Sequence, residues 1–282
     1  MKKFLPQFLI LSAIVLFLLG GIFALKYLPE FLEKQSLKPP PPFKKLENIQ
    51  GISVSSESGK IKYPHDYTIV LLGDSMTESL GNADELRGYL NEYFPEKTFE
   101  VLNYGYGATS ILSAKERLTQ TTHYANRDFR PILDIDFDFL IVESFGHNPL
   151  SQFREEGLKK QTEVLDEIYS LVATSSGREK LIFLSTIGTD KKNYAKNSKP
   201  DLLPEIRQQW ALERDSYLQN HLSQAKFYGI PGIDVFNASL DSSGNVKSYL
   251  VRDDDNLHPS PKGVLFISKK IADFLAQNQF IK

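Results

Sequence analysis

The sequence has no cysteine, and it carries little excess charge of either sign. Without cysteine, the 282-residue chain cannot use a thiolate nucleophile, a disulfide bond or a cysteine-ligated metal. Its 33 Lys and Arg against 35 Asp and Glu give a formal charge of -2, so no basic excess is present to neutralise phosphates. We therefore expect no nucleic-acid partner. With 41% hydrophobic and 24% charged residues, the composition is that of an ordinary globular protein.

Charged residues are also missing from an apolar run near the N-terminus, Phe8 to Leu25, which Lys2 and Lys3 precede and Lys26 follows. The run is long enough to cross a bilayer, and it is longer than the apolar core of a cleaved signal peptide. We therefore predict an uncleaved signal anchor over residues 1–26, with the rest of the chain outside the cytoplasm. Cleavage of this segment would instead give a secreted protein.

The composition changes after the apolar run. Residues 27–63 are rich in Lys, Glu, Ser and Pro, and four consecutive prolines occupy Pro39 to Pro42. Consecutive prolines favour an extended polyproline helix, so we predict a semi-rigid spacer between the membrane and a globular domain over residues 64–282. A proline-rich ligand for a partner protein is the alternative, but nothing else in this segment indicates recognition.

Short apolar runs rich in β-branched and aromatic residues alternate with longer amphipathic stretches in the predicted domain. The predicted strands are 67–72, 99–103, 137–142, 180–184 and, more weakly, 233–236. The predicted helices are 79–93, 110–119, 152–173, 204–226 and 261–277. Continuous apolar strands separated by helices indicate a mostly parallel five-stranded sheet between two helical layers, an α/β/α fold. Sites in such sheets lie at the carboxyl ends of the strands.

The first predicted strand runs into Gly73-Asp74-Ser75. Gly73 permits a sharp turn where the strand ends, which would leave the Ser75 hydroxyl at the edge of the sheet and near the start of a helix. Helix capping is the competing interpretation, because Asp and Ser both satisfy the free N–H groups of a first helical turn.

Two further strand ends supply candidate hydrogen-bond donors. The second predicted strand runs into Asn103-Tyr104-Gly105-Tyr106-Gly107, where a glycine N–H can point into a site unobstructed, as an oxyanion hole requires. Gly146-His147-Asn148 follows the third strand, and the Asn148 amide is a neutral donor suited to the same task. A plain glycine turn and an Asn-Pro turn are the competing interpretations.

An acidic segment with one histidine, residues 253–258, precedes the last predicted helix. Asp255 and His258 are three residues apart, so a tight turn can bring the carboxylate to one imidazole nitrogen while the other faces a serine. The run of aspartates is also compatible with a solvated loop or a weak cation site. Because no further cluster of oxygen ligands lies nearby in the sequence, we predict no metal.

Together these four segments resemble the sequence blocks of the SGNH (GDSL) hydrolases, over the chain from about Tyr67 to the C-terminus. The resemblance implies a flavodoxin-like fold and a serine ester hydrolase that needs no cofactor. It implies Ser75 as the nucleophile, with His258 and Asp255 as its activating pair. The implied donors of the oxyanion hole are Ser75, Gly107 and Asn148.

The sequence departs from the usual SGNH pattern at two places. The glycine block is one residue shorter, which leaves Gly105 as an alternative to Gly107, and Pro149 follows Asn148 where the family often has Asp. Three aromatic residues would lie near the site by their positions in the blocks. They are candidates for contact with the substrate, with core packing as the competing role: Tyr104, Tyr106 and Phe145.

We therefore expect a carboxylic ester hydrolase that acts on a small-molecule, lipid or glycan ester, for example an O-acetyl or lipid acyl ester. The same triad would serve an O-acetyltransferase acting on a cell-envelope glycan, and acetyl transfer faster than hydrolysis would separate the two. A non-catalytic binding module is the remaining alternative. The complete set of Ser, Gly, Asn, Asp and His argues against it.

Overall fold

The computed structural model describes residues 59–198 and 202–282, together with residues 30, 33–34, 36–40 and 53–54. The predicted membrane anchor over residues 1–26 lies outside the described residues, as does most of the predicted spacer. Among the described residues, we find no helix with the length and apolar character needed to cross a bilayer.

The described residues form a central sheet of five parallel strands in the order β4-β3-β7-β8-β9. Every residue of the two strands β7 and β8 is buried, as their continuous apolar sequences predict. The predicted parallel sheet is thus confirmed. The strands are β3 (Tyr67–Gly73), β4 (Phe99–Gly105), β7 (Phe139–Glu143), β8 (Leu181–Ser185) and β9 (Gly232–Asp234).

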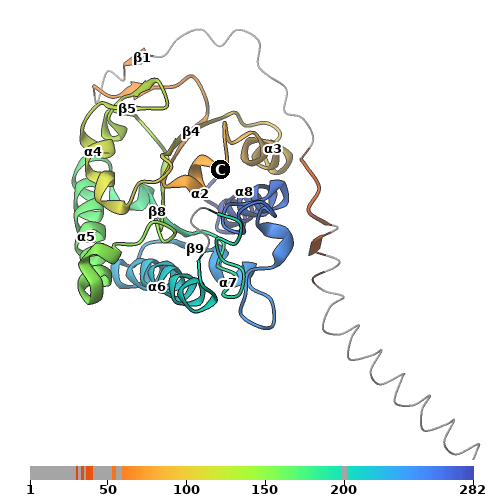
Figure 1. Ribbon diagram of the computed structural model, residues 1–282. Coiled ribbons are helices and arrows are strands. Elements are labelled where there is room, and N and C mark those ends of the chain that lie inside the picture. Colours follow the sequence, from red (N-terminus) through yellow and green to blue (C-terminus); the bar gives the residue numbers. More distant parts are fainter. Residues whose placement is uncertain (1–29, 31–32, 35, 41–52, 55–58, 199–201) are drawn as a thin grey trace, which may run out of the picture.

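Helices cover both faces of this sheet (Figure 1). One face carries α3 (Asp84–Tyr93) and α8 (Pro261–Gln277), and the other carries α4 (Ala114–Thr119), α5 (Gly157–Ser175) and α6 (Pro204–Tyr228). Successive side chains of a strand point to opposite faces, so alternate residues of β3 enter two separate apolar clusters, one under each helical layer. The expected α/β/α arrangement of layers is confirmed.

Several short elements refine the predicted boundaries. α2 (Ser75–Glu78) is a single helical turn directly after β3, and it precedes α3. β9 ends earlier than predicted, because the Asp234 side chain accepts a hydrogen bond from the Asn237 N–H and starts α7 (Val235–Ser239). The 3₁₀ turns are η1 (Ile111–Ser113), η2 (Ile132–Asp134), η3 (Ser151–Glu156), η4 (Arg178–Lys180) and η5 (Ser248–Leu250).

An antiparallel hairpin that was not predicted joins β5 (Thr122–Tyr124) to β6 (Arg127–Phe129). Its two-residue turn consists of Ala125 and Asn126, which both have positive φ angles, of 48° and 59°. Two-residue hairpin turns favour this backbone conformation, and Asn tolerates it well, so Asn126 was the local signal. A second short pair joins β1 (Ser53–Val54) to β2 (Ile61–Lys62).

The described residues from 33 to 38 contact the globular domain. Glu33 forms an ion pair with Lys247, and Leu37 is 5% exposed in the apolar cluster under α3 and α8. The Tyr89 hydroxyl donates to the Lys38 carbonyl oxygen at 2.7 Å. This part of the predicted spacer therefore lies against the α3 and α8 face of the domain.

Candidate active site

The structure brings together the three residues of the predicted triad at the carboxyl edge of the sheet. Ser75 is the first residue of α2, directly after β3, and His258 and Asp255 lie in the loop between η5 and α8. The Ser75 Oγ lies 3.0 Å from His258 Nε2, and His258 Nδ1 lies 2.7 Å from Asp255 Oδ2. These distances allow a proton to pass from the serine hydroxyl to the imidazole.

Arg252 adds a cation to this arrangement. Its Nη2 hydrogen-bonds to Asp255 Oδ2 and also lies 3.1 Å from His258 Nδ1. Nδ1 cannot both donate to Asp255 and accept from Arg252. The shorter contact of 2.7 Å, to a carboxylate, indicates that Nδ1–H donates to Asp255 and leaves Nε2 free to accept from Ser75.

Asp255 is held in its ionised form. Burial by itself raises the pKa of this carboxyl group, but hydrogen bonds from the His258 and Arg252 side chains and from the Leu257 and His258 N–H groups outweigh it. The net result lowers the pKa of Asp255 to about 2. At neutral pH a carboxylate is thus available to fix the imidazole tautomer and to stabilise an imidazolium.

The opposite side of Ser75 holds hydrogen-bond donors. Asp74 caps α2, because its Oδ1 accepts from the Met76 N–H at 2.8 Å. The capping residue is therefore Asp74 and not Ser75. Asp74 Oδ2 accepts from Asn148 Nδ2 at 2.9 Å. One Asn148 amide hydrogen is thereby fixed, and its second remains to donate to a ligand.

Asp74 lies against a second buried carboxyl group. Glu143, the last residue of β7, is 2% exposed and Asp74 is 0% exposed. The Asp74 N–H donates to Glu143 Oε2 at 3.3 Å, and Glu143 Oε1 accepts from the Ser144 hydroxyl and the Phe145 N–H. Burial, together with the nearby Asp74, raises the pKa of Glu143 well above its usual range. The environment of Glu143 therefore favours its protonated form relative to a carboxyl group in water.

A buried arginine completes the network under the nucleophile. Arg117 is 1% exposed, and its Nη1 donates to the carbonyl oxygens of Gly73 at 2.6 Å and Tyr104 at 2.8 Å. Burial lowers the pKa of Arg117 to about 10, which still leaves the guanidinium charged at neutral pH. Because these carbonyls lie at the carboxyl ends of two adjacent strands, Arg117 fixes the loop that carries Ser75 relative to the loop that carries Gly107.

The two glycines proposed as oxyanion donors both have partners within the protein. The Gly105 N–H donates to Asn103 Oδ1 at 2.8 Å, and the Gly107 N–H donates to the Tyr124 hydroxyl at 2.8 Å. That hydroxyl in turn donates to Glu78 Oε1 at 2.7 Å. Within the described residues, the Ser75 N–H has no hydrogen-bond partner and the Gly107 N–H is occupied.

The three aromatic candidates for substrate contact are all buried. Tyr104, Tyr106 and Phe145 are 4%, 5% and 1% exposed. The Tyr104 hydroxyl donates to the Arg130 carbonyl oxygen, and the Tyr106 ring stacks on Tyr124 with centroids 4.4 Å apart. Their burial favours the competing role of core packing, because strand ends that approach a site also contribute to the packing beneath it.

Sequence patterns did not identify several residues that shape the site. The hairpin supplies Tyr124 from 17 residues beyond Gly107, and no motif links the two. Glu143 is the last residue of an otherwise apolar, buried strand. A carboxyl group at such a position was the one feature of the sequence that could have indicated its role. Arg252 lies three residues before Asp255, and it carried no distinguishing pattern.

The sequence matches no family profile and no curated protein. Solved structures do match. A lipase/acylhydrolase from Enterococcus faecalis has a TM-score of 0.53 at 16% identity and covers 75% of this chain and 96% of its own. A variant of an acetyl-xylooligosaccharide esterase from Geobacillus stearothermophilus has a TM-score of 0.51 at 14% identity and covers 74% and 94%.

A third structure, described as a lipolytic protein of the G-D-S-L family from Desulfitobacterium hafniense, has a TM-score of 0.50 at 16% identity and covers 74% of this chain and 100% of its own. The fold of this chain therefore matches that of lipase/acylhydrolase and G-D-S-L family structures. At this level of identity the likeness concerns the fold, and the chemistry of this chain has to be argued from its own residues.

Proposed function

We propose that this protein is a serine esterase or acylhydrolase that cleaves a carboxylic ester through Ser75, His258 and Asp255. The observation that carries the proposal is the chain of contacts at 3.0 Å and 2.7 Å that joins the three side chains at the carboxyl edge of the sheet. The esterases and lipase that share the fold give further support.

In the first half of the reaction, Ser75 Oγ attacks the ester carbonyl carbon while His258 Nε2 takes the hydroxyl proton. The carbonyl oxygen becomes an oxyanion that accepts hydrogen bonds from the Ser75 N–H and the Asn148 amide. His258 then gives its proton to the leaving alkoxide, the C–O bond breaks, and the alcohol departs. Asp255 stabilises the imidazolium throughout.

In the second half, water attacks the acyl group on Ser75. His258 Nε2 takes one proton from the water, and it returns that proton to Ser75 Oγ as the acid leaves. Atoms and charges balance without a cofactor. Gly107 is the third proposed donor to the oxyanion, and its N–H becomes available once the Tyr124 hydroxyl moves away.

The test is hydrolysis of p-nitrophenyl acetate and of longer p-nitrophenyl esters by the full-length protein and by Ser75→Ala. We expect activity in the wild type, and a loss of kcat of at least about 10⁴-fold in the variant. Ser170→Ala, at an exposed position on α5, is the matched control and should match the wild type. Equal activity of Ser75→Ala and wild type would refute the assignment of the nucleophile.

We also propose that residues 1–26 anchor the enzyme in a membrane with the domain outside the cytoplasm. The support is the uncharged run over residues 8–25, flanked by lysines. Fractionation of cells should recover the protein with the membranes, and protease added to intact protoplasts should digest the domain. Recovery in the soluble cytoplasmic fraction would contradict this proposal.

A further inference from the structure

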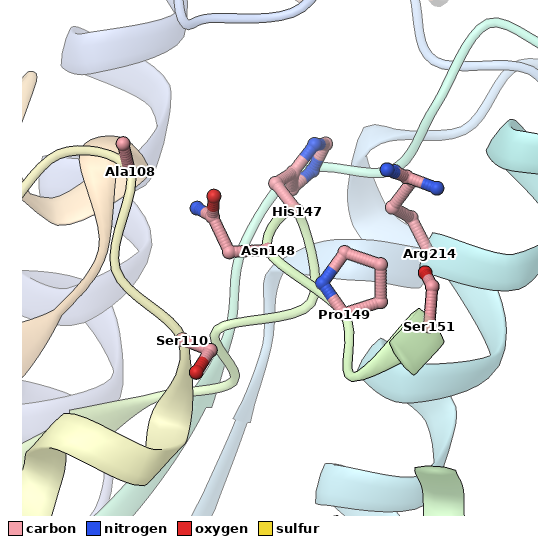
Figure 2. A pocket seen from close by; sticks show the side chains of 7 residues that line it. All are labelled: Ala108, Ser110, His147, Asn148, Pro149, Ser151 and Arg214. Carbon is pink, nitrogen blue, oxygen red and sulfur yellow. The ribbon is translucent and has the colours of Figure 1, made fainter. Parts of the chain in front are cut away.

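A pocket opens beside the Asn148 amide, between the loop that follows β4 and the loop that follows β7 (Figure 2). Its volume is about 300 Å³, which is at the small end of the range for sites that bind small molecules. Because Asn148 is a proposed oxyanion donor, a substrate held at Ser75 would extend part of itself into this space. The lining residues are Ala108, Ser110, His147, Asn148, Pro149, Ser151 and Arg214.

Polar groups dominate the walls of the pocket. Hydroxyl, imidazole, amide and guanidinium groups line it, and apolar surface comes mainly from Ala108 and Pro149. An alkyl chain in this space would remove water from Ser110 and Arg214 without replacing the lost hydrogen bonds, which is unfavourable. The pocket is therefore unsuited to a fatty acyl chain.

One wall offers both hydrogen-bond donors and acceptors. Arg214 Nη1 donates to Glu213 Oε2 at 2.8 Å, and Glu213 Oε1 accepts from the Ser151 hydroxyl at 2.6 Å. The arginine charge is thus faced by a carboxylate. Because Glu213 offsets the charge of Arg214, an anionic ligand gains little net attraction at this wall, whereas a hydroxyl group can accept from Arg214 and can donate to or accept from the Ser151 hydroxyl. The wall fits an uncharged ligand with several hydroxyl groups.

Ser110 lines the pocket on the other side of Asn148 from Arg214, as Figure 2 shows. It precedes η1 but makes no side-chain capping hydrogen bond, and its backbone carbonyl accepts from the Ser113 N–H and from the Ser113 hydroxyl. Within the described residues its own hydroxyl has no protein partner. Ser110 is therefore available to a ligand, and it can be replaced without breaking a contact that holds the loop.

An exposed tryptophan lies next to this wall. Trp210 is one turn before Arg214 on α6 and is 40% exposed, and the Arg214 guanidinium lies 4.8 Å from its ring centroid. The arginine holds the indole in place while part of the indole surface remains open. A flat aromatic surface beside hydroxyl-binding groups suits a ring with an apolar face and a polar edge, which describes a sugar.

We propose that this pocket binds the alcohol part of the ester, and that this part is an uncharged polyhydroxylated group of the sugar type. The proposal rests on the proposed esterase function, since it assigns the leaving group of that reaction. It names Ser110 and Arg214, which line the pocket, as residues that determine specificity, with Trp210 in contact with Arg214 beside them.

The experiment compares two acetate esters of similar shape with the full-length protein. One is 6-O-acetylglucose, and the other is cyclohexylmethyl acetate, which has the same ring size without hydroxyl groups. We expect kcat/KM to be at least tenfold higher for the sugar ester. In Ser110→Leu, which fills the pocket, the ratio of kcat/KM for 6-O-acetylglucose to that for p-nitrophenyl acetate should fall at least tenfold.

Two further variants distinguish the loss of a ligand contact from a folding defect. Ser110→Ala removes only the hydroxyl, and the same ratio should fall about threefold to tenfold, the usual effect of one hydrogen bond. Ser170→Leu on α5 is the matched control, because its carbonyl also accepts from a side-chain hydroxyl, that of Thr174, and it should leave the ratio unchanged.

The possible outcomes test the sugar subsite and the esterase assignment separately. Equal or faster turnover of cyclohexylmethyl acetate, or an unchanged ratio in both Ser110 variants, would overturn the sugar subsite while the esterase assignment stands. Faster turnover of O-acetylglucuronate than of 6-O-acetylglucose would also overturn it, in favour of an anion site. Absence of activity on every ester, p-nitrophenyl acetate included, would instead refute the proposed function.

Discussion

The two sides of Ser75 are built in different ways. On the side of the proton acceptor, His258 and Asp255 belong to one short loop, and their side chains are 25% and 16% exposed. On the oxyanion side, Asp74 and Glu143 come from different strand ends and are almost completely buried. One half of the site is thus a local turn near the surface, and the other half is part of the core.

We therefore expect the two halves to respond differently to substitution. A loop near the surface tolerates substitutions around the reacting groups. In that half, we expect only changes to the residues that accept or stabilise the proton to lower kcat. In the buried half, each polar group depends on its neighbours for hydrogen bonds, so a change to one affects the others. The following variants test that contrast.

The largest effect is expected for Asp255→Asn on the exposed side. A carboxamide favours the wrong imidazole tautomer, and kcat for p-nitrophenyl acetate should fall about 10⁴-fold, as the same change does in serine proteases with this triad. The matched control is Asp254→Asn, since the Asp254 side chain is 75% exposed and its ion pair within the described residues is with Arg252 Nε, at 3.4 Å. An equal loss in the control would show that the wrong aspartate had been paired with His258.

On the buried side, Asn148→Ala should lower kcat about 100-fold to 1000-fold with little change in KM, because it removes one donor to the oxyanion. Steady-state kinetics measures both constants. Asn278→Ala, at the end of α8, removes an amide far from the site and should behave as the wild type. If Asn148→Ala retained its kcat, the amide would have only a structural role through Asp74.

A smaller effect of opposite sign is expected for Tyr124→Phe. The Tyr124 hydroxyl holds the Gly107 N–H in the resting structure, and its removal frees that donor for the oxyanion. One hydrogen bond is worth about 1 kcal/mol, so kcat/KM should rise about fivefold. Tyr93→Phe removes a hydroxyl that bonds Asp273 instead and is the control. An unchanged or lower kcat/KM would exclude Gly107 as a donor.

The smallest change in activity is expected for Glu143→Gln, within about threefold, because glutamine is also neutral and has the same shape. Its effect is on stability. The pKa of Glu143 is raised in the folded protein, while the carboxyl group of the unfolded chain ionises above a pH of about 4.3, so the wild type loses stability as pH rises from there towards the folded pKa. Glutamine does not titrate, so the variant escapes this loss.

Urea unfolding between pH 4.5 and pH 8 measures this difference. Relative to the wild type, the free energy of unfolding of Glu143→Gln should rise with pH by at most about 1.4 kcal/mol per pH unit. Glu155→Gln, at an exposed position in η3, is the control for loss of a carboxylate. A difference between wild type and Glu143→Gln that is constant over this range would mean that Glu143 is ionised in the folded protein.

Much of the fold follows from patterns that are local in the chain. The predicted helix 261–277 begins and ends where α8 does, because Ser260 caps it and Pro261 occupies its first turn. The strands lie within about two residues of the predicted runs, since β-branched and aromatic residues between glycines favour short buried strands. The hairpin of β5 and β6 was missed because its strands are short and largely exposed.

Local patterns were enough to predict the alternation of strands and helices, the strand end that carries Ser75, and a turn that brings Asp255 to His258. These features depend on residues that are close in the chain. The hydrogen bond from the Gly107 N–H to Tyr124, the burial of Glu143 beside Asp74 and the burial of the three aromatic candidates could be seen in the folded protein alone. Such contacts and burial depend on which distant segments pack together, and that is set by the assembled layers rather than by any local pattern.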